Sequence, residues 1–263
     1  MTNAVTDCVT DWPPCPHAGE HFNAERTRAQ WPQLHGHDAE PLPADAAVLH
    51  AWALYHSGHL AAAAQTGLQA GPGGLPVAQA ATAAHASLVE PRETTRLALY
   101  QHIHARACSH TAAAPASASA WYWQGWSLAR QAQGIDVARA LARGLGTQVR
   151  AALEAALALA PGHALAHAAL AGFHAEVIDK VGPLVADMSY GARASTAHHH
   201  LHHALRLPPA APVLLDCADA LITLEGPARL AEATRLLEQA AALTPRDVPE
   251  RLWVELARAR LAL

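Results

Sequence analysis

Histidine is the residue type in this chain with the clearest capacity for chemistry. The 263 residues include 19 histidines, and five of them lie in one run, His198, His199, His200, His202 and His203. On a helix, His198 and His202 share one face, as do His199 and His203, and this spacing can hold a divalent metal ion. Adjacent members of the run face different sides of the helix, however, and no HExxH-type glutamate lies between them. The run therefore predicts a solvated helix face, with a His-rich metal-binding protein as the alternative.

Residues 174–180 form a second chemically mixed stretch, with His174, Glu176, Asp179 and the only lysine of the chain, Lys180. Glu176 and Lys180 have the i, i+4 order that favours an ion pair on a helix surface. That ion pair is the simpler interpretation. The alternative is a polar cluster in which His174 and Glu176 share a proton or bind the amine of a ligand.

Aromatic residues gather in residues 121–126, Trp-Tyr-Trp-Gln-Gly-Trp, and an arginine follows one turn later. Tyr122, Trp123, Trp126 and Arg130 have the composition of a binding hot spot, where aromatic rings supply apolar area and arginine supplies charge. The alternative is that the tryptophans fill the core between alanine-rich helices.

The remaining sequence argues against several function classes. The chain has no GxSxG motif, no Gly-rich loop followed by Lys-Ser or Lys-Thr, and no paired-carboxylate motif, so we expect neither an enzyme nor a cofactor. The formal charge is −4 and the basic residues are scattered, which argues against a nucleic-acid footprint. Cysteines without a CxxC motif, the lack of an N-terminal signal and the lack of a long apolar window predict a cytoplasmic protein without a membrane span.

The elements that position these residues are predicted to be helices throughout. Hydrophobic residues make up 51 % of the chain but aromatic residues only 5 %, and alanine, the strongest helix former, is abundant. Alternating apolar residues of the kind that forms strands are rare. We therefore expect an all-α fold.

Proline and glycine divide the chain into segments. Residues 1–44 are predicted to be an irregular N-terminal leader with one candidate short helix over 20–31, ended by Pro32, after which a helix begins with Asp45 as its cap. Residues 45–108 predict degenerate helix pairs, and residues 119–263 predict a longer array. That array has units at about 119–161, 164–209 and 212–245, followed by a helix over 249–263.

The three units share one pattern, in which a first helix precedes a second helix of spaced Ala and Leu residues that ends at a proline. This pattern resembles the tetratricopeptide (TPR) repeat, and the chain looks most like bacterial TPR proteins with elongated units. The matching residues are Trp121, Gly125, Leu128, Val149, Leu153, Ala156, Leu157, Leu159 and Pro161; then Leu170, Ala171, Ala197, Leu201, Ala204, Leu205, Leu207 and Pro209; then Leu215, Ala218, Ala233, Leu237, Ala240, Leu243 and Pro245. Two insertions, over 134–146 and 176–191, are predicted to add helical segments.

The resemblance implies a TPR-like helical-hairpin solenoid with irregular repeats and a C-terminal capping helix. It also implies a concave groove, formed by the first helices, that binds a segment of a partner protein. By position, Tyr122, Trp126, Arg130 and Glu176 would line this groove, with Trp123 and His174 beside it. The expected function is therefore a non-enzymatic protein–protein interaction scaffold with an unidentified protein or peptide as its partner. A small ligand in the groove is an alternative, and self-association is compatible with the pattern.

Overall fold

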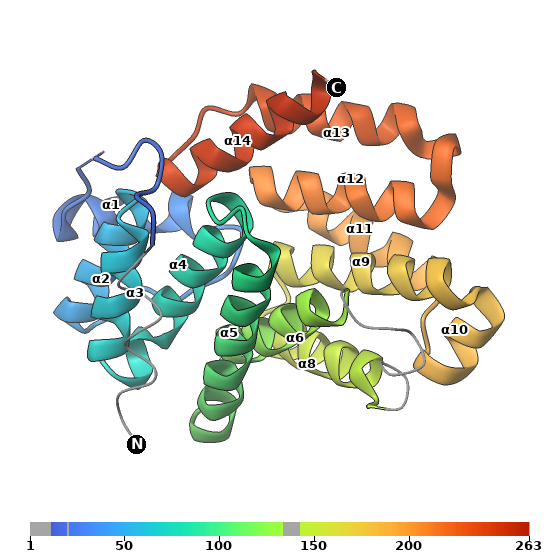
Figure 1. Cartoon of the computed structure of the whole chain (residues 1–263), viewed down its shortest axis with the longest axis horizontal. Coiled ribbons are helices and arrows are strands. Elements are labelled where there is room, and N and C mark those ends of the chain that lie inside the picture. Colours follow the sequence, from blue (N-terminus) through green and yellow to red (C-terminus); the bar gives the residue numbers. More distant parts are fainter. Residues whose placement is uncertain (1–11, 20, 134–142, 263) are drawn as a thin grey trace.

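The computed structural model of the chain describes residues 12–19, 21–133 and 143–262 (Figure 1). All regular structure within these ranges is helical, which confirms the predicted all-α class. The helices are α1 (Ala24–Leu34), α2 (Ala46–His56), α3 (Leu60–Gln69), η1 (Pro72–Gly74), α4 (Leu75–Leu88), α5 (Glu93–Ala113), α6 (Ala118–Ala132), α8 (Leu145–Leu159), α9 (Ala164–Val181), α10 (Pro183–Tyr190), α11 (Ala194–Arg206), α12 (Ala211–Glu225), η2 (Gly226–Arg229), α13 (Leu230–Ala242) and α14 (Val248–Leu261).

Polar side chains fix the first turns of several helices, as the sequence predicts for Asp45. The carboxylate of Asp45 accepts hydrogen bonds from two amides of the first turn of α2, at 2.7 and 3.2 Å. Asn23, Ser117 and Asp247 cap α1, α6 and α14 in the same way. A cap of this kind satisfies amides that have no partner inside the helix and contributes about 1 kcal/mol.

Helices that follow one another along the chain pack in pairs. α2 packs on α3, α4 on α5, α6 on α8, α9 on α11, and α12 on α13. Contacts of α5 with α6, of α8 with α9 and of α9 with α12 join one pair to the next. Figure 1 shows the pairs in succession, from the blue N-terminal part to the red C-terminal part.

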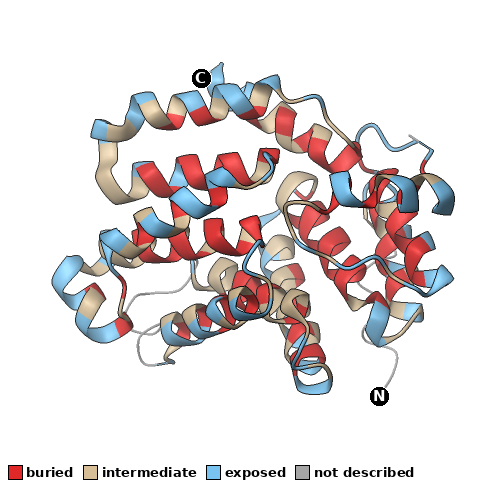
Figure 2. Cartoon of the chain, turned by 180° about the vertical axis from the view of Figure 1, so that it is seen from behind, coloured by how far each residue is buried: buried red, intermediate tan, exposed pale blue. Residues whose placement is uncertain are grey.

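The core of these pairs consists mainly of small residues. In Figure 2 the buried residues form stripes along the helices rather than covering them. Along α9, for example, Ala164, Ala168, Ala171 and Ala175 are all buried and recur at the helical period. Because alanine has a single side-chain carbon, such a stripe lets neighbouring helices approach closely.

Two sequence predictions are corrected by the structure. The predicted irregular leader contains α1, whose Trp31 and Leu34 are buried in the core. The degenerate pairs do not end at residue 108, because α5 continues to Ala113.

The second insertion does form helix, since it holds the end of α9 and the short α10, which are separated at Gly182. Residues 134–142, which make up most of the first insertion, lie outside the described residues.

The last helix, α14, joins the two ends of the array. Its Val254 and Ala257 are fully buried in the cluster formed with α12 and α13. At its N-terminal end, Val248 and Leu252 join a different cluster, which includes Leu60 of α3. Figure 1 shows α14 spanning the distance between the α12–α13 pair and the N-terminal helices. The predicted capping helix is therefore corrected in one respect: it covers the last core on one side and the first core on the other, and the array closes on itself.

Gly125 marks a close approach of α6 and α8. A Cβ atom at this position would lie 2.8 Å from Cγ of Leu153 and 3.2 Å from the carbonyl oxygen of Val149. By contrast, a Cβ atom at Gly172 on α9 would have no other atom within 4 Å. The two helical glycines therefore differ: the first permits close packing, and the second leaves open space.

Alanine substitutions at these two glycines should have opposite effects on stability. Gly172→Ala is expected to raise the free energy of unfolding by about 0.5–1 kcal/mol, because glycine is the weaker helix former. Gly125→Ala should lower it by about 1–3 kcal/mol, because overpacking against Leu153 outweighs the gain in helix propensity. Urea unfolding followed by circular dichroism measures both values. Equal stabilities of the two variants would contradict the close approach of α6 and α8.

Deleting residues 249–263 should destabilise both ends of the array. The deletion removes Leu252 from the N-terminal cluster and Val254 from the C-terminal one, and it exposes the apolar surfaces that they cover. We expect a lower melting temperature and aggregation, measured by differential scanning fluorimetry and size-exclusion chromatography. Arg260→Ala, at an exposed surface ion pair, is the control and should change little. A truncated chain with unchanged melting temperature and solubility would contradict the packing of α14 against both clusters.

Candidate functional site

Two adjoining cavities lie between the helix pairs. The first, here called the α9 cavity, has a volume of about 210 Å³ and lies between α6, α8, α9 and α12; its lining includes Trp126, Arg130, Gly172, Glu176, Lys180 and Thr223. The second, the central cavity, has a volume of about 100 Å³ and lies where α14 meets α2, α4, α6 and α12. Its lining includes His35, His37, Asp38, Trp52, Tyr55, His56, Tyr122, Trp123, Arg246, Asp247, Glu250 and Trp253. Trp126, Arg130 and Asp216 line both cavities.

An arginine–carboxylate pair separates the two cavities. Nη2 of Arg130 lies 3.5 Å from Oδ1 of Asp216, and the guanidinium group lies over the ring of Trp126, 5.3 Å from its centroid. Burial raises the pKa of Asp216 above its ordinary value, and the neighbouring Arg130 acts in the opposite direction. Arg130 therefore has two partners, the aromatic face of Trp126 and the carboxylate of Asp216, and both hold it where the two cavities meet.

The predicted groove residues reach these cavities, but as parts of the walls. Tyr122 and Trp126 are only 4 % and 8 % exposed, so their rings pack in the core and present limited surface to the cavities. Glu176 lines the α9 cavity, and its Oε1 accepts a hydrogen bond from Nε2 of Gln133 at 2.6 Å. The simple ion pair expected between Glu176 and Lys180 is not among the ion pairs of the described residues.

His174 does not line either cavity, and the alternative in which it shares a proton with Glu176 does not fit the structure. Its side chain is buried between α9 and α11, and its Nδ1 lies 3.4 Å from the backbone nitrogen of Arg193. Residues two positions apart on a helix face different sides, so His174 points to the core while Glu176 points to the cavity.

The His-rich run divides among separate contacts. His198 forms an ion pair with Glu225 on α12, and Nδ1 of His200 lies 2.9 Å from Nδ1 of His167. The ring of His203 stacks on that of His167, with centroids 5.1 Å apart, and the ring of His199 is tilted against that of His203 at 4.4 Å. His202 is exposed. In the described part of the chain, no three His, Cys, Asp or Glu side chains come together as a group that could hold a metal ion.

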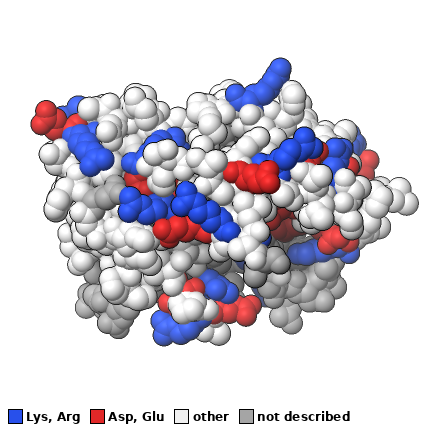
Figure 3. All heavy atoms as spheres, turned by 90° about the horizontal axis from the view of Figure 1, so that it is seen from above, with Lys and Arg blue, Asp and Glu red and all other residues white. Residues whose placement is uncertain are grey.

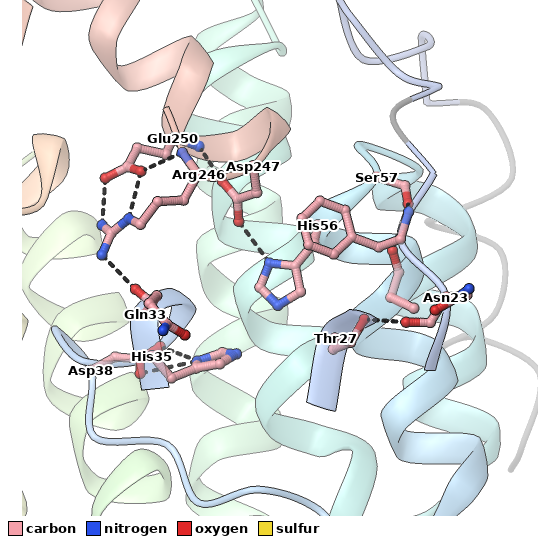
Figure 4. Close-up of polar contacts among 12 residues, drawn as sticks. Asn23, Thr27, Gln33, His35, Asp38, His56, Ser57, Arg246, Asp247 and Glu250 are labelled. Atoms are coloured by element: carbon pink, nitrogen blue, oxygen red, sulfur yellow. Dashed lines mark hydrogen bonds and ion pairs between the residues drawn. The ribbon is translucent and has the colours of Figure 1, made fainter. Parts of the chain in front are cut away.

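Two histidine–carboxylate pairs form the polar part of the central cavity. Nδ1 of His56 donates to Oδ2 of Asp247 at 2.6 Å, and Nδ1 of His35 lies 3.0 and 3.1 Å from the two carboxylate oxygens of Asp38. The two imidazole rings are buried, with centroids 5.2 Å apart. Figure 4 shows the four side chains following one another from Asp247 through His56 and His35 to Asp38.

Burial and hydrogen bonding set the charges of these groups. Burial lowers the pKa of His56, so its imidazole is neutral at neutral pH. Burial alone would raise the pKa of Asp247, but the hydrogen bond from His56 outweighs it and the pKa is lowered. The pKa of Asp38 is also lowered, because the effect of the neighbouring His35 and His37 exceeds that of burial. Both carboxylates are therefore ionised.

Arg246 completes the contact between the two ends of the chain. Its Nε and Nη2 donate to the two carboxylate oxygens of Glu250 at 2.7 and 2.5 Å. Its Nη1 donates to the backbone carbonyl of Gln33 at 2.6 Å. Figure 4 shows this arginine reaching from the start of α14 to the end of α1. One side chain thus ties α14 to α1.

Sequence reasoning found the aromatic side of the central cavity, with Tyr122, Trp123 and Trp126, but missed its polar side. Its only local signal is the segment His35-Gly36-His37-Asp38, where three ionisable residues lie within four positions. His56 and Asp247 have no such signal, because they are 191 residues apart. Their contact depends on the closure of the array, which helical periodicity does not predict.

Comparisons of the chain with protein-family models, with curated proteins and with solved structures found no match. Among the described helices, none has the length and apolar character that crossing a membrane requires.

The buried histidines predict a loss of stability in acid. Burial lowers the pKa of His163, His174 and His200 to about 4, from an ordinary value of 6.5. As the pH falls from about 6.5 to about 4, the unfolded chain takes up protons at these positions while the folded chain does not. The free energy of unfolding should therefore fall through this window and be independent of these residues above about pH 7.

Urea midpoints at about pH 7.5 and about pH 5 test this expectation. His200→Gln should reduce the difference between the two midpoints, because it removes one half-buried imidazole whose pKa is lowered. His202→Gln, at an exposed histidine of the same helix, is the control and should leave the difference unchanged. A midpoint that rises toward acid would contradict the assignment.

Proposed function

We propose that the chain is a non-enzymatic interaction scaffold of the TPR type, and that it binds an extended segment of a partner protein in the α9 cavity. The proposal rests on the open space beside Gly172. The buried stripe of the same helix is filled by alanines in contact with α11 and α12, whereas no atom lies within 4 Å of a Cβ built at Gly172. A guest side chain fits this space without displacing any part of the protein.

The lining of the α9 cavity indicates the chemistry of the guest. Its walls include Leu145, Val149 and Phe173, and its rim carries Glu176 and Lys180. Burial of one large apolar side chain against such walls contributes about 1.5–3 kcal/mol. Rim charges of both signs favour polar residues on either side of that anchor. We therefore expect a segment with one large apolar residue between polar neighbours.

The distribution of charge supports a segment of mixed character. On the face shown in Figure 3, Lys and Arg side chains lie close to Asp and Glu side chains. The exposed pairs Arg193–Asp187 and Arg229–Glu232 are of this kind. Such a surface attracts neither a strongly basic nor a strongly acidic partner over long range.

A small apolar ligand in the α9 cavity is the second candidate. Its volume of about 210 Å³ and its apolar walls suit a compact molecule as well as a side chain. We further propose a cytoplasmic location, which the free thiols of Cys15, Cys108 and Cys217 support.

Filling the cavity should abolish binding without unfolding the protein. Peptides selected on the wild type from a random display library should bind Gly172→Leu about tenfold more weakly or worse, because the new side chain occupies the place of the anchor. Gly162→Leu is the matched control, since Gly162 also has open space around it but lies in the turn before α9. It should bind the peptides as the wild type does.

Circular dichroism and melting temperature establish that both variants remain folded. Peptides that bind Gly172→Leu as tightly as Gly162→Leu would place the site elsewhere and refute the proposal. If no peptide is enriched, but an apolar fluorescent dye binds the wild type and not Gly172→Leu, the small-ligand alternative replaces it.

A further inference from the structure

The charges that line the central cavity do not balance. Four carboxylates and two guanidinium groups line it, namely Asp38, Asp216, Asp247, Glu250, Arg130 and Arg246. Arg246 is paired with Glu250, and Arg130 with Asp216. Asp38 and Asp247 have imidazoles as their side-chain partners. Because an ionised group inside a protein is costly unless it is compensated, the cavity favours a positive charge.

The apolar part of the lining also suits a cation. Trp52, Tyr55, Tyr122, Trp123 and Trp253 line the central cavity together with Trp126. Aromatic faces attract cations through their quadrupole, and the attraction is larger where water is excluded. An anion would meet the excess of carboxylates, and a metal ion would need a set of three ligands that the described residues do not form.

We propose that the central cavity binds a small organic ammonium ion through the carboxylates of Asp38 and Asp247 and the surrounding aromatic rings. The ammonium group supplies a positive charge and N–H donors for the carboxylate oxygens. This site is separate from the opening beside Gly172, and it does not depend on the binding of a partner segment there.

Isothermal titration calorimetry at fixed ionic strength and neutral pH tests the proposal, with n-butylammonium chloride as the probe. n-Butanol and sodium butyrate are controls of the same chain length without the positive charge. We expect the ammonium ion to bind and the two controls not to bind. Tetramethylammonium, which has a charge but no N–H, should bind more weakly than butylammonium. N-acetyl-lysine methylamide offers the same ammonium group on a larger body, so its binding distinguishes a lysine side chain from a free amine as the source.

Asp38→Asn removes one charge and keeps an acceptor, so it should weaken butylammonium binding by about tenfold or more. Asp187→Asn, at an exposed ion pair outside both cavities, is the matched control and should not change the affinity. Butanol binding as tightly as butylammonium, no binding of butylammonium, or equal affinities of the two variants would overturn the proposal.

Discussion

The carboxylate of Asp247 holds the first and last parts of this protein together. It caps α14 by accepting the amide of Glu250 at 2.8 Å, and it accepts the imidazole of His56 on α2 at 2.6 Å. One side chain therefore sets both where the last helix begins and where that helix docks. Both partners are buried, so the loss of either would leave the other uncompensated in the interior, at a cost of several kcal/mol. The central cavity, its paired histidines and the contact of Arg246 with α1 all follow from this docking.

The packing of alanine explains why cavities remain between well-packed pairs. Stripes such as Ala164, Ala168 and Ala171 bring helices within a pair close together and leave little room for large side chains. Several aromatic residues, Trp126 and Trp253 among them, line the space that remains between the helix pairs. Alanine stripes and large rings together thus leave cavities between closely packed helices.

The local sequence pattern predicts most of the helices, but it does not predict that the last helix packs against the first part of the chain. Helical periodicity, proline and the cap at Asp45 predict the pairs in residues 45–263, and the expected register brings Trp126, Arg130 and Glu176 to one cavity. The same reasoning placed a short helix over 20–31 in the leader and ended it at Pro32, whereas α1 runs from Ala24 to Leu34 with Pro32 inside it. It also could not find the pairing of His56 with Asp247, since nothing local to either residue encodes a partner 191 positions away.

The contact of α14 with the first part of the chain would distinguish this fold from a linear array of repeats. In a linear array each unit contacts only its neighbours, so stability is a sum over units and folding can begin anywhere and spread. Here α14 contacts α2 and α4 as well as α12 and α13, so the last helix also packs on helices from the first part of the chain. Bringing these distant segments together costs loop-closure entropy. An extra helix pair inserted between α4 and α12 would carry α14 away from its place on α2, so this contact constrains which insertions the fold accepts.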